Sequence, residues 1–212
     1  ANPDAAQGAA EGMISANPEA ATEIATSMAE ANPDSAGDIA AGLADSAPAS
    51  AIDAASAMAE ANPDIAGAVA GGVAANAPQV AAATAGSIAE DSPELAGDIA
   101  AGVAEAAPAM TGIVVADLAQ SNPEGAAEMV ATAVEAVPEA AANIAQGVIA
   151  ADPQAAAQVA AQVAEINPEA AADVAGGMAQ VAPSLAGDIA GAMAESNPEL
   201  AGQVAQGMAD AN

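Results

Sequence analysis

Carboxylates are the only side chains in this 212-residue sequence that ionise near neutral pH. There are 29 Asp and Glu residues, no Lys, Arg, His or Cys, and no aromatic residue. Two chemistries are open to carboxylates alone: cation binding, since Ca²⁺ prefers carboxylate and amide oxygens, and hydrolysis by a carboxylate pair, as in glycoside hydrolases. The aromatic platforms that a sugar-cleaving site normally uses are missing. We therefore expect no enzyme, no catalytic residue and no organic cofactor.

The candidate cation sites follow a recurring pattern in which two acids flank an Asn-Pro pair. The order is acid, any residue, Asn, Pro, acid, so each site offers two carboxylates and one amide oxygen. Asn before Pro also suits the cap of a helix, which is the competing interpretation. The pattern predicts weak Ca²⁺ ligation by four sets of residues: Glu30, Asn32 and Asp34; Glu60, Asn62 and Asp64; Glu165, Asn167 and Glu169; Glu195, Asn197 and Glu199.

The missing residue types exclude several classes of partner. The formal net charge is −29, with no Lys or Arg to neutralise phosphates, so we expect no nucleic-acid partner. The same charge opposes binding to an anionic membrane surface, and we expect no membrane partner. Without Cys there is neither a disulfide framework nor a thiolate nucleophile.

Proline sets a strict period of 15 residues from Pro3 to Pro198. Residues 1–212 therefore predict one continuous array of fourteen repeats. We number the positions of each repeat from the residue before proline, which is position 1. The repeats then begin at residues 2, 17, 32, 47, 62, 77, 92, 107, 122, 137, 152, 167, 182 and 197. Proline suits the first helical position, and the residue before it is pushed out of the helical region. Each repeat therefore predicts one helix from Pro to about position 13 or 14, capped by position 1 and followed by a turn of two or three residues.

The residue types separate into faces of that helix. Positions 5, 8, 9, 12 and 13 carry mainly Ala, Ile, Val, Leu and Met, which is the stripe of an amphipathic helix. Positions 3, 7 and 14, which we call the acidic ridge, hold 25 of the 29 acids. Positions 6, 10 and 11 hold 17 of the 19 Gly residues. Gly costs a helix about 1 kcal/mol relative to Ala, so its regular placement predicts close approach of neighbouring helices.

These faces predict an all-α fold, an α-solenoid of single-helix repeats with Ala, Ile, Val and Met inside and the acidic ridge outside. One short helix is marginal alone, so stacked repeats must bury the stripe jointly. The architecture resembles that of the tetratricopeptide and HEAT solenoids, although their signature aromatic and arginine positions are absent. A two-layer, up-down stack is favoured over a three-sided coil. The 25 residues without charge from Ile65 to Ala89 keep the repeat phase, and we interpret them as two repeats rather than a membrane span.

The repeat phase runs through both ends without polar capping repeats, so we expect the array to continue, as a longer polypeptide or as copies stacked end to end. Head-to-tail contacts that do not close produce filaments. We therefore predict a structural protein of an extracellular or cell-surface filament, fibre, sheath or matrix, with copies of itself as partners. The alternative is an acidic Ca²⁺-binding repeat module or adhesin stalk; an ice-binding protein and an engineered array are minor alternatives.

One repeat departs from the acidic ridge. Ala109, Ile113 and Gln120 stand where other repeats carry acids. Neutral, apolar positions on an acidic face can mark a lateral contact between rods. Ordinary drift of the repeat sequence is the competing interpretation.

Overall fold

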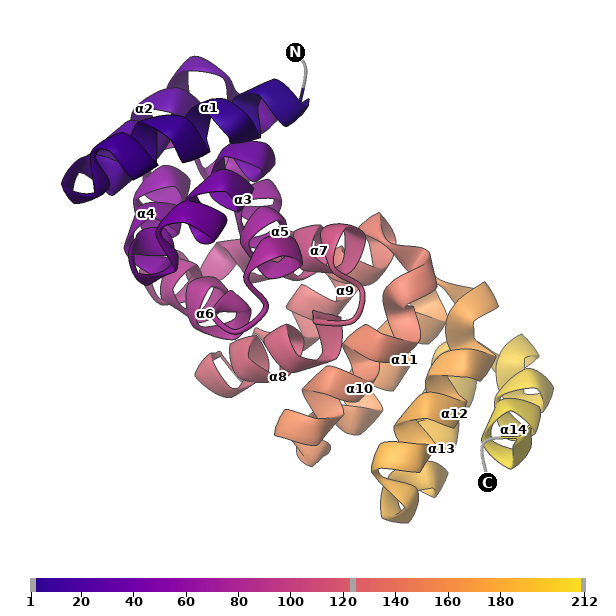
Figure 1. Cartoon of the computed structure of the whole chain (residues 1–212). Helices are drawn as coiled ribbons and strands as arrows, with labels where there is room; N and C mark the ends of the chain where they lie inside the picture. The colour runs from indigo at the N-terminus through magenta and orange to yellow at the C-terminus, as the bar shows by residue number, and fades with distance from the viewer. Residues whose placement is uncertain (1–2, 123–124, 211–212) are drawn as a thin grey trace. The chain divides into compact units, whose positions relative to one another are not determined.

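A computed structural model describes residues 3–122 and 125–210, and within them the protein is all-α with no strand (Figure 1). Fourteen α-helices occupy these residues, one in each repeat. Their bounds are α1 Pro3–Ala16, α2 Ala21–Ala31, α3 Ala36–Ser46, α4 Pro48–Ala61, α5 Ala66–Asn76, α6 Ala81–Asp91, α7 Ala96–Ala106, α8 Thr111–Ser121, α9 Ala126–Ala136, α10 Ala141–Ala151, α11 Ala156–Ile166, α12 Ala171–Val181, α13 Ala186–Ser196 and α14 Ala201–Asp210.

Proline begins most of the described helical segments, as its fixed φ and missing N–H favour. In α1 and α4 the α-helix starts at the proline itself. In most other repeats the proline opens a three-residue 3₁₀ turn that runs directly into the α-helix. These turns are Pro18–Ala20, Pro33–Ser35, Pro63–Ile65, Pro93–Leu95, Pro138–Ala140, Pro153–Ala155, Pro168–Ala170, Pro183–Leu185 and Pro198–Leu200. Two residues of the predicted boundaries, Asn2 and Pro123, lie outside the described residues.

The helices run slightly further than the predicted end at about position 13 or 14, because α1 to α13 all continue to position 15. A single residue separates each of α1 to α7 and α9 to α13 from the next proline, rather than a turn of two or three. At Asn32, which joins α2 to Pro33, the backbone N–H still donates to the Met28 carbonyl oxygen at 3.0 Å and closes the last helical turn. Its φ of −146° and ψ of 75° show why the helix stops there: the clash with proline excludes the helical region.

The residues group into two compact units, Ala1–Met110 and Thr111–Asn212. In each unit a helix packs most extensively against the helix two repeats away and less against its sequence neighbours. The N-terminal unit thus has a layer of α1, α3, α5 and α7 and a layer of α2, α4 and α6; the C-terminal unit has a layer of α8, α10, α12 and α14 and a layer of α9, α11 and α13 (Figure 1). Each unit is a two-layer α-solenoid, as predicted; a three-sided coil would join helices three repeats apart.

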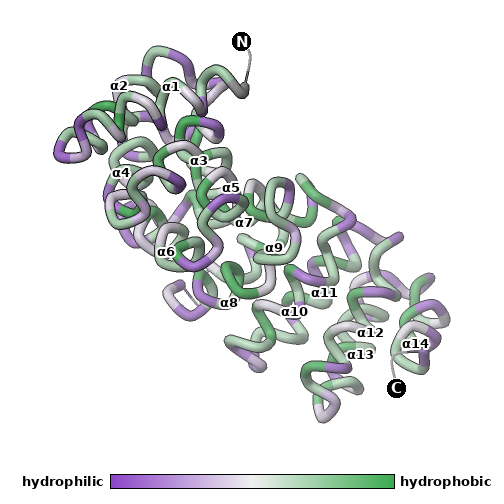
Figure 2. The backbone as a smooth tube through the Cα atoms, viewed as in Figure 1, coloured by the Kyte–Doolittle hydropathy of each residue, from purple (hydrophilic) through white to green (hydrophobic). Residues whose placement is uncertain are grey.

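The core of each unit lies along the predicted stripe. Positions 8 and 12 are fully buried in the inner helices, for example Ile39 and Leu43 in α3 and Ile99 and Val103 in α7. Small Ala side chains at positions 5, 9 and 13 fill the remaining buried surface and let the helices lie close together. Figure 2 shows the result along the backbone, where the hydrophilic residues fall mainly near the helix ends and turns.

Glycine marks the contact between helices of one layer, which confirms the predicted close approach. Position 11 of one helix lies against position 6 of the helix two repeats earlier. A Cβ atom on Gly147 would lie 2.6 Å from the carbonyl oxygen of Gly112, and one on Gly42 would lie 2.6 Å from that of Gln7. Real Cβ atoms do not approach so closely. Any larger residue would therefore push the two helices apart.

Within the described residues, no helix combines the length and the apolar character needed to cross a membrane. The stretch without charge, Ile65–Ala89, falls mainly on α5 and α6, which have 11 residues each and belong to different layers of the N-terminal unit.

Candidate functional site

The acidic ridge faces solvent in both units. Among the ridge acids whose side chains the structure describes, Asp38 is half-buried and all the others are exposed. Within one helix the ridge places acids four residues apart, as with Asp34 and Asp38, and such like-charge pairs oppose helix formation. With no Lys, Arg or His in the sequence, only dissolved ions can offset this repulsion. The ridge therefore makes the surface of each unit strongly anionic.

At the predicted Ca²⁺ sites, the amide oxygen already caps the following helix in three of the four sets. The Oδ1 atom of Asn62 accepts from the Asp64 N–H at 3.3 Å, and Asn197 accepts in the same way from Glu199. Asn167 accepts from the Ala170 N–H at 3.2 Å. Capping at these sites confirms the structural interpretation of the Asn-Pro pairs, and it competes with a cation for the same oxygen.

In the fourth set, Asn32 instead donates from Nδ2 to the Ser35 Oγ at 2.7 Å. The flanking carboxylates of all four sets are exposed: Glu30, Asp34, Glu60, Asp64, Glu165, Glu169, Glu195 and Glu199. In the part of the chain that the structure describes, no three Asp or Glu side chains are grouped so that they could hold a metal ion. Ca²⁺ ligation by two carboxylates and one amide stays a prediction.

A groove of about 520 Å³ crosses one layer of the N-terminal unit. Its floor is smooth because Gly and Ala from α3, α5 and α7 line it, among them Gly37, Gly72 and Ala101. Its ionisable groups are four carboxylates, Asp38, Asp64, Asp98 and Glu105. The groove thus presents acceptor oxygens and no positive side chain.

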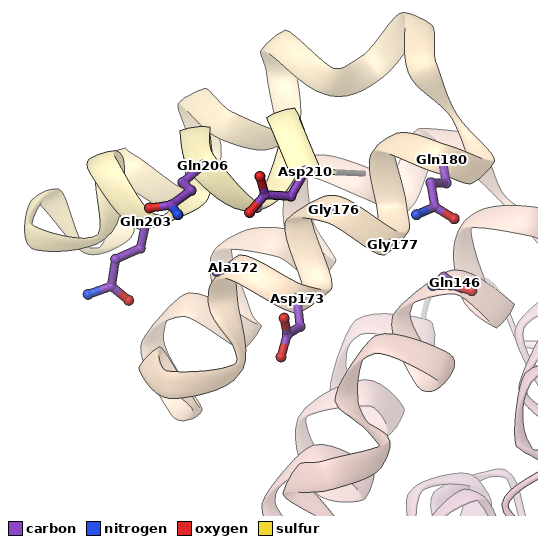
Figure 3. A pocket seen from close by; sticks show the side chains of 10 residues that line it. Gln146, Ala172, Asp173, Gly176, Gly177, Gln180, Gln203, Gln206 and Asp210 are labelled. Atoms are coloured by element: carbon purple, nitrogen blue, oxygen red, sulfur yellow. The ribbon is translucent and has the colours of Figure 1, made fainter. Parts of the chain in front are cut away.

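A second groove, of about 460 Å³, crosses α10, α12 and α14 in the C-terminal unit (Figure 3). Amides replace most of the carboxylates here, and the polar lining consists of Gln146, Gln180, Gln203, Gln206, Asp173 and Asp210. Each Gln offers both a hydrogen-bond donor and an acceptor. Sequence reasoning missed this groove, although Gln at ridge positions 7 and 14 was a visible signal.

Of the residues predicted to form a lateral contact, Ile113 and Gln120 lie on the surface of the C-terminal unit, and Ala109 lies in the last turn of the N-terminal unit. Ile113 on α8 is 58% exposed, and Ala109 and Gln120 are exposed as well. The sequence did not single out the other large exposed apolar side chains, Met13, Ile166 and Val181.

Buried hydroxyl groups serve packing rather than chemistry in the described residues. Ser56 in α4 and Ser87 in α6 share a hydrogen bond of 2.8 Å that links two helices of one layer. Thr84 and Thr111 are 0% exposed, and their Oγ1 atoms have no hydrogen-bond partner.

Comparison of the chain with protein-family models, with curated proteins and with solved structures gives no match.

Proposed function

We propose that this chain is a structural repeat protein that builds an extracellular or cell-surface filament, fibre, sheath or matrix by end-to-end stacking of its helices. The observation that supports the proposal is the recurring contact of position 11 on position 6, seen for Gly42 on Gln7 and for Gly147 on Gly112. A solenoid grows by repeating one kind of neighbour contact. Adding further helices to either unit therefore requires no new type of interface.

The surface chemistry agrees with this role and gives no reason to assign catalysis. A uniform shell of carboxylates keeps an otherwise apolar rod dispersed. The sequence also lacks Lys, Arg and aromatic residues, the usual cleavage positions of trypsin-like and chymotrypsin-like proteases. Such a composition suits a material exposed to secreted proteases.

Electron microscopy of the purified 212-residue chain tests the proposed function. The charge of −29 per copy opposes association, and salt shortens the Debye length from about 30 Å at 0.01 M to about 10 Å at 0.1 M. We expect single particles at low salt and filaments that lengthen with protein concentration at physiological salt. Discrete particles of constant size under all conditions would contradict the proposal.

We also propose that filaments associate side by side through the neutral patch of Ala109, Ile113 and Gln120. The support is the 58% exposure of Ile113 at ridge position 7, which carries an acid in seven other repeats. Replacing Ile113 with Glu should abolish bundles in micrographs while single filaments remain. If bundles form as before, the neutral residues of this repeat reflect ordinary drift of the repeat sequence and not a contact between filaments.

A further inference from the structure

The helices of one layer contact each other through two different faces. Positions 6 and 10 of each helix form its leading face, which meets the next helix of the layer. Positions 7 and 11 form its trailing face, which meets the previous one. Ser56, at position 10 of α4, and Ser87, at position 11 of α6, make one such contact through a hydrogen bond of 2.8 Å between their hydroxyl groups. Gly112, at position 6 of α8, meets Gly147, at position 11 of α10, in the same way.

The first and last helices each leave one of these faces without a partner. On the leading faces of α13 and α14, a Cβ atom on Gly187, Gly191 or Gly202 would meet nothing within 4 Å. On the trailing face of α1, the same holds for Gly8 and Gly12. Apart from Gly8, these glycines hold the repeat positions (6, 10 and 11) of glycines that lie against backbone inside the array, such as Gly67, Gly71 and Gly147. The surfaces at both ends therefore have the small residues of the internal contact but no helix packed on them.

Next to the open trailing face of α1, two positions of its apolar stripe are exposed as well. Ala9 and Met13, at positions 8 and 12, are exposed, and Met13 is 50% exposed. At the other end, Met193 in α13 holds position 12 and is fully buried. Exposed Gly, Ala and Met next to each other, without a carboxylate between them, form a surface that water does not stabilise.

We propose that a second copy of this chain docks its α1 and α2 on α13 and α14 of the first, in the register that joins helices within one layer. Gly12 of the second copy then lies over Gly187, and its Met13 enters the space between the two layers. In this register α1 of the second copy packs on α13 and its α2 packs on α14, as helices two repeats apart do within one layer, and the alternation of helix direction is preserved. This inference rests on the proposed function and names its contact.

Two variants that block opposite faces test the register. Gly12→Gln with Met13→Gln blocks the trailing face, and Gly187→Gln with Gly191→Gln blocks the leading face. The glycine sites have open space in the single chain, and Gln favours helix over Gly by several tenths of a kcal/mol. Both variants should therefore keep the far-UV circular dichroism of the wild type. Ala49→Gln with Ser184→Gln is the matched control, because both sites are exposed at position 3 of the acidic ridge and belong to neither proposed contact.

Sedimentation velocity at 0.15 M and 0.5 M NaCl gives the readout. We expect a concentration-dependent series of oligomers for the wild type and the control, and monomers alone for each blocked variant. Mixing the two blocked variants should give a 1:1 dimer, because the open leading face of one variant can bind the open trailing face of the other. Nothing larger should form, because both remaining faces of that dimer are blocked.

Three results would overturn the inference. If the variant with the blocked leading face (Gly187→Gln with Gly191→Gln) still dimerises without the other variant, α1 of one copy pairs with α1 of another in a symmetric contact. If filaments persist in both variants, the proposed function stands but uses a different contact. If the wild type stays monomeric at high salt and high concentration, the inference and the proposed function fail together.

Discussion

Met178 in α12 and Met13 in α1 hold the same repeat position, yet Met178 is fully buried and Met13 is half exposed. Gly147 and Gly12 repeat the contrast at position 11, where the first lies against the backbone of Gly112 and the second faces open space. Two things differ: no helix of the described residues lies two repeats before α1, and the first repeat carries the fully buried Ile14 at position 13, where the repeat of Met178 carries Ala179. Burial in this protein is therefore a property of the array and not of the single repeat, and terminal helices carry interior surfaces to solvent.

The largest effect should come from removing a buried side chain at position 12. We expect Met178→Ala to lower the free energy of unfolding by about 3 kcal/mol, because buried Met→Ala leaves a cavity. Met13→Ala should change it by less than about 0.5 kcal/mol, since an exposed site has little packing to lose. Urea titration followed by circular dichroism measures both. Equal losses would show that α1 is covered in the isolated chain.

Adding one methyl group at position 11 should have opposite signs in the two places. Gly147→Ala should lower the free energy of unfolding by about 1–2 kcal/mol, because overpacking against Gly112 outweighs the gain in helix propensity. Gly12→Ala should raise it by about 0.5–1 kcal/mol. Thermal unfolding of the two variants side by side gives the comparison. Stabilisation by both substitutions would mean that the helices separate without cost.

Replacing each of two Asn residues at position 1 with Ala should give a smaller difference in the free energy of unfolding. Asn167→Ala should cost about 1 kcal/mol, since the side chain caps the following helix through the Ala170 N–H. Asn17 makes no side-chain capping bond, so Asn17→Ala should cost clearly less. Hydrogen exchange at Ala170 and at Ala20 reports the local change at each helix start. Equal acceleration at both sites would refute this assignment.

The smallest expected effect is an increase in the free energy of unfolding, caused by a substitution inside the array. Thr84 is fully buried with no partner for its hydroxyl group, and Val, which has the same shape, stands at the equivalent positions 69 and 114. Thr84→Val should raise the free energy of unfolding by about 0.5–1 kcal/mol, because an unsatisfied buried polar group is costly. Thr132→Val is the control, since that side chain is not fully buried and donates to the Glu128 carbonyl oxygen. If Thr84→Val instead lowers the free energy of unfolding, the Thr84 hydroxyl group has a hydrogen-bond partner in solution.

The sequence predicted the elements that depend on local geometry. Proline every 15 residues imposes one helix per repeat, and the burial of Ile39 and Leu43 follows from helical periodicity. The helix ends were misplaced because one more backbone hydrogen bond, such as Asn32 to Met28, forms before the proline than propensity indicates. The grooves and the exposure of Met13 could not be predicted in this way, since both depend on which helices lie two repeats apart.

The single-residue connection between helices has a consequence for how such a protein can change in length. One residue inserted into a helix, or deleted from it, would turn the remaining part of that helix by about 100° about its axis, directing its carboxylates inward and its Ile and Met residues to water. Nothing in a connection of one residue can absorb that rotation. Insertions and deletions that preserve the fold must therefore add or remove whole repeats of fifteen residues. Where α1 of one copy must still pack on α13 of another, they must add or remove two repeats, or thirty residues, at a time.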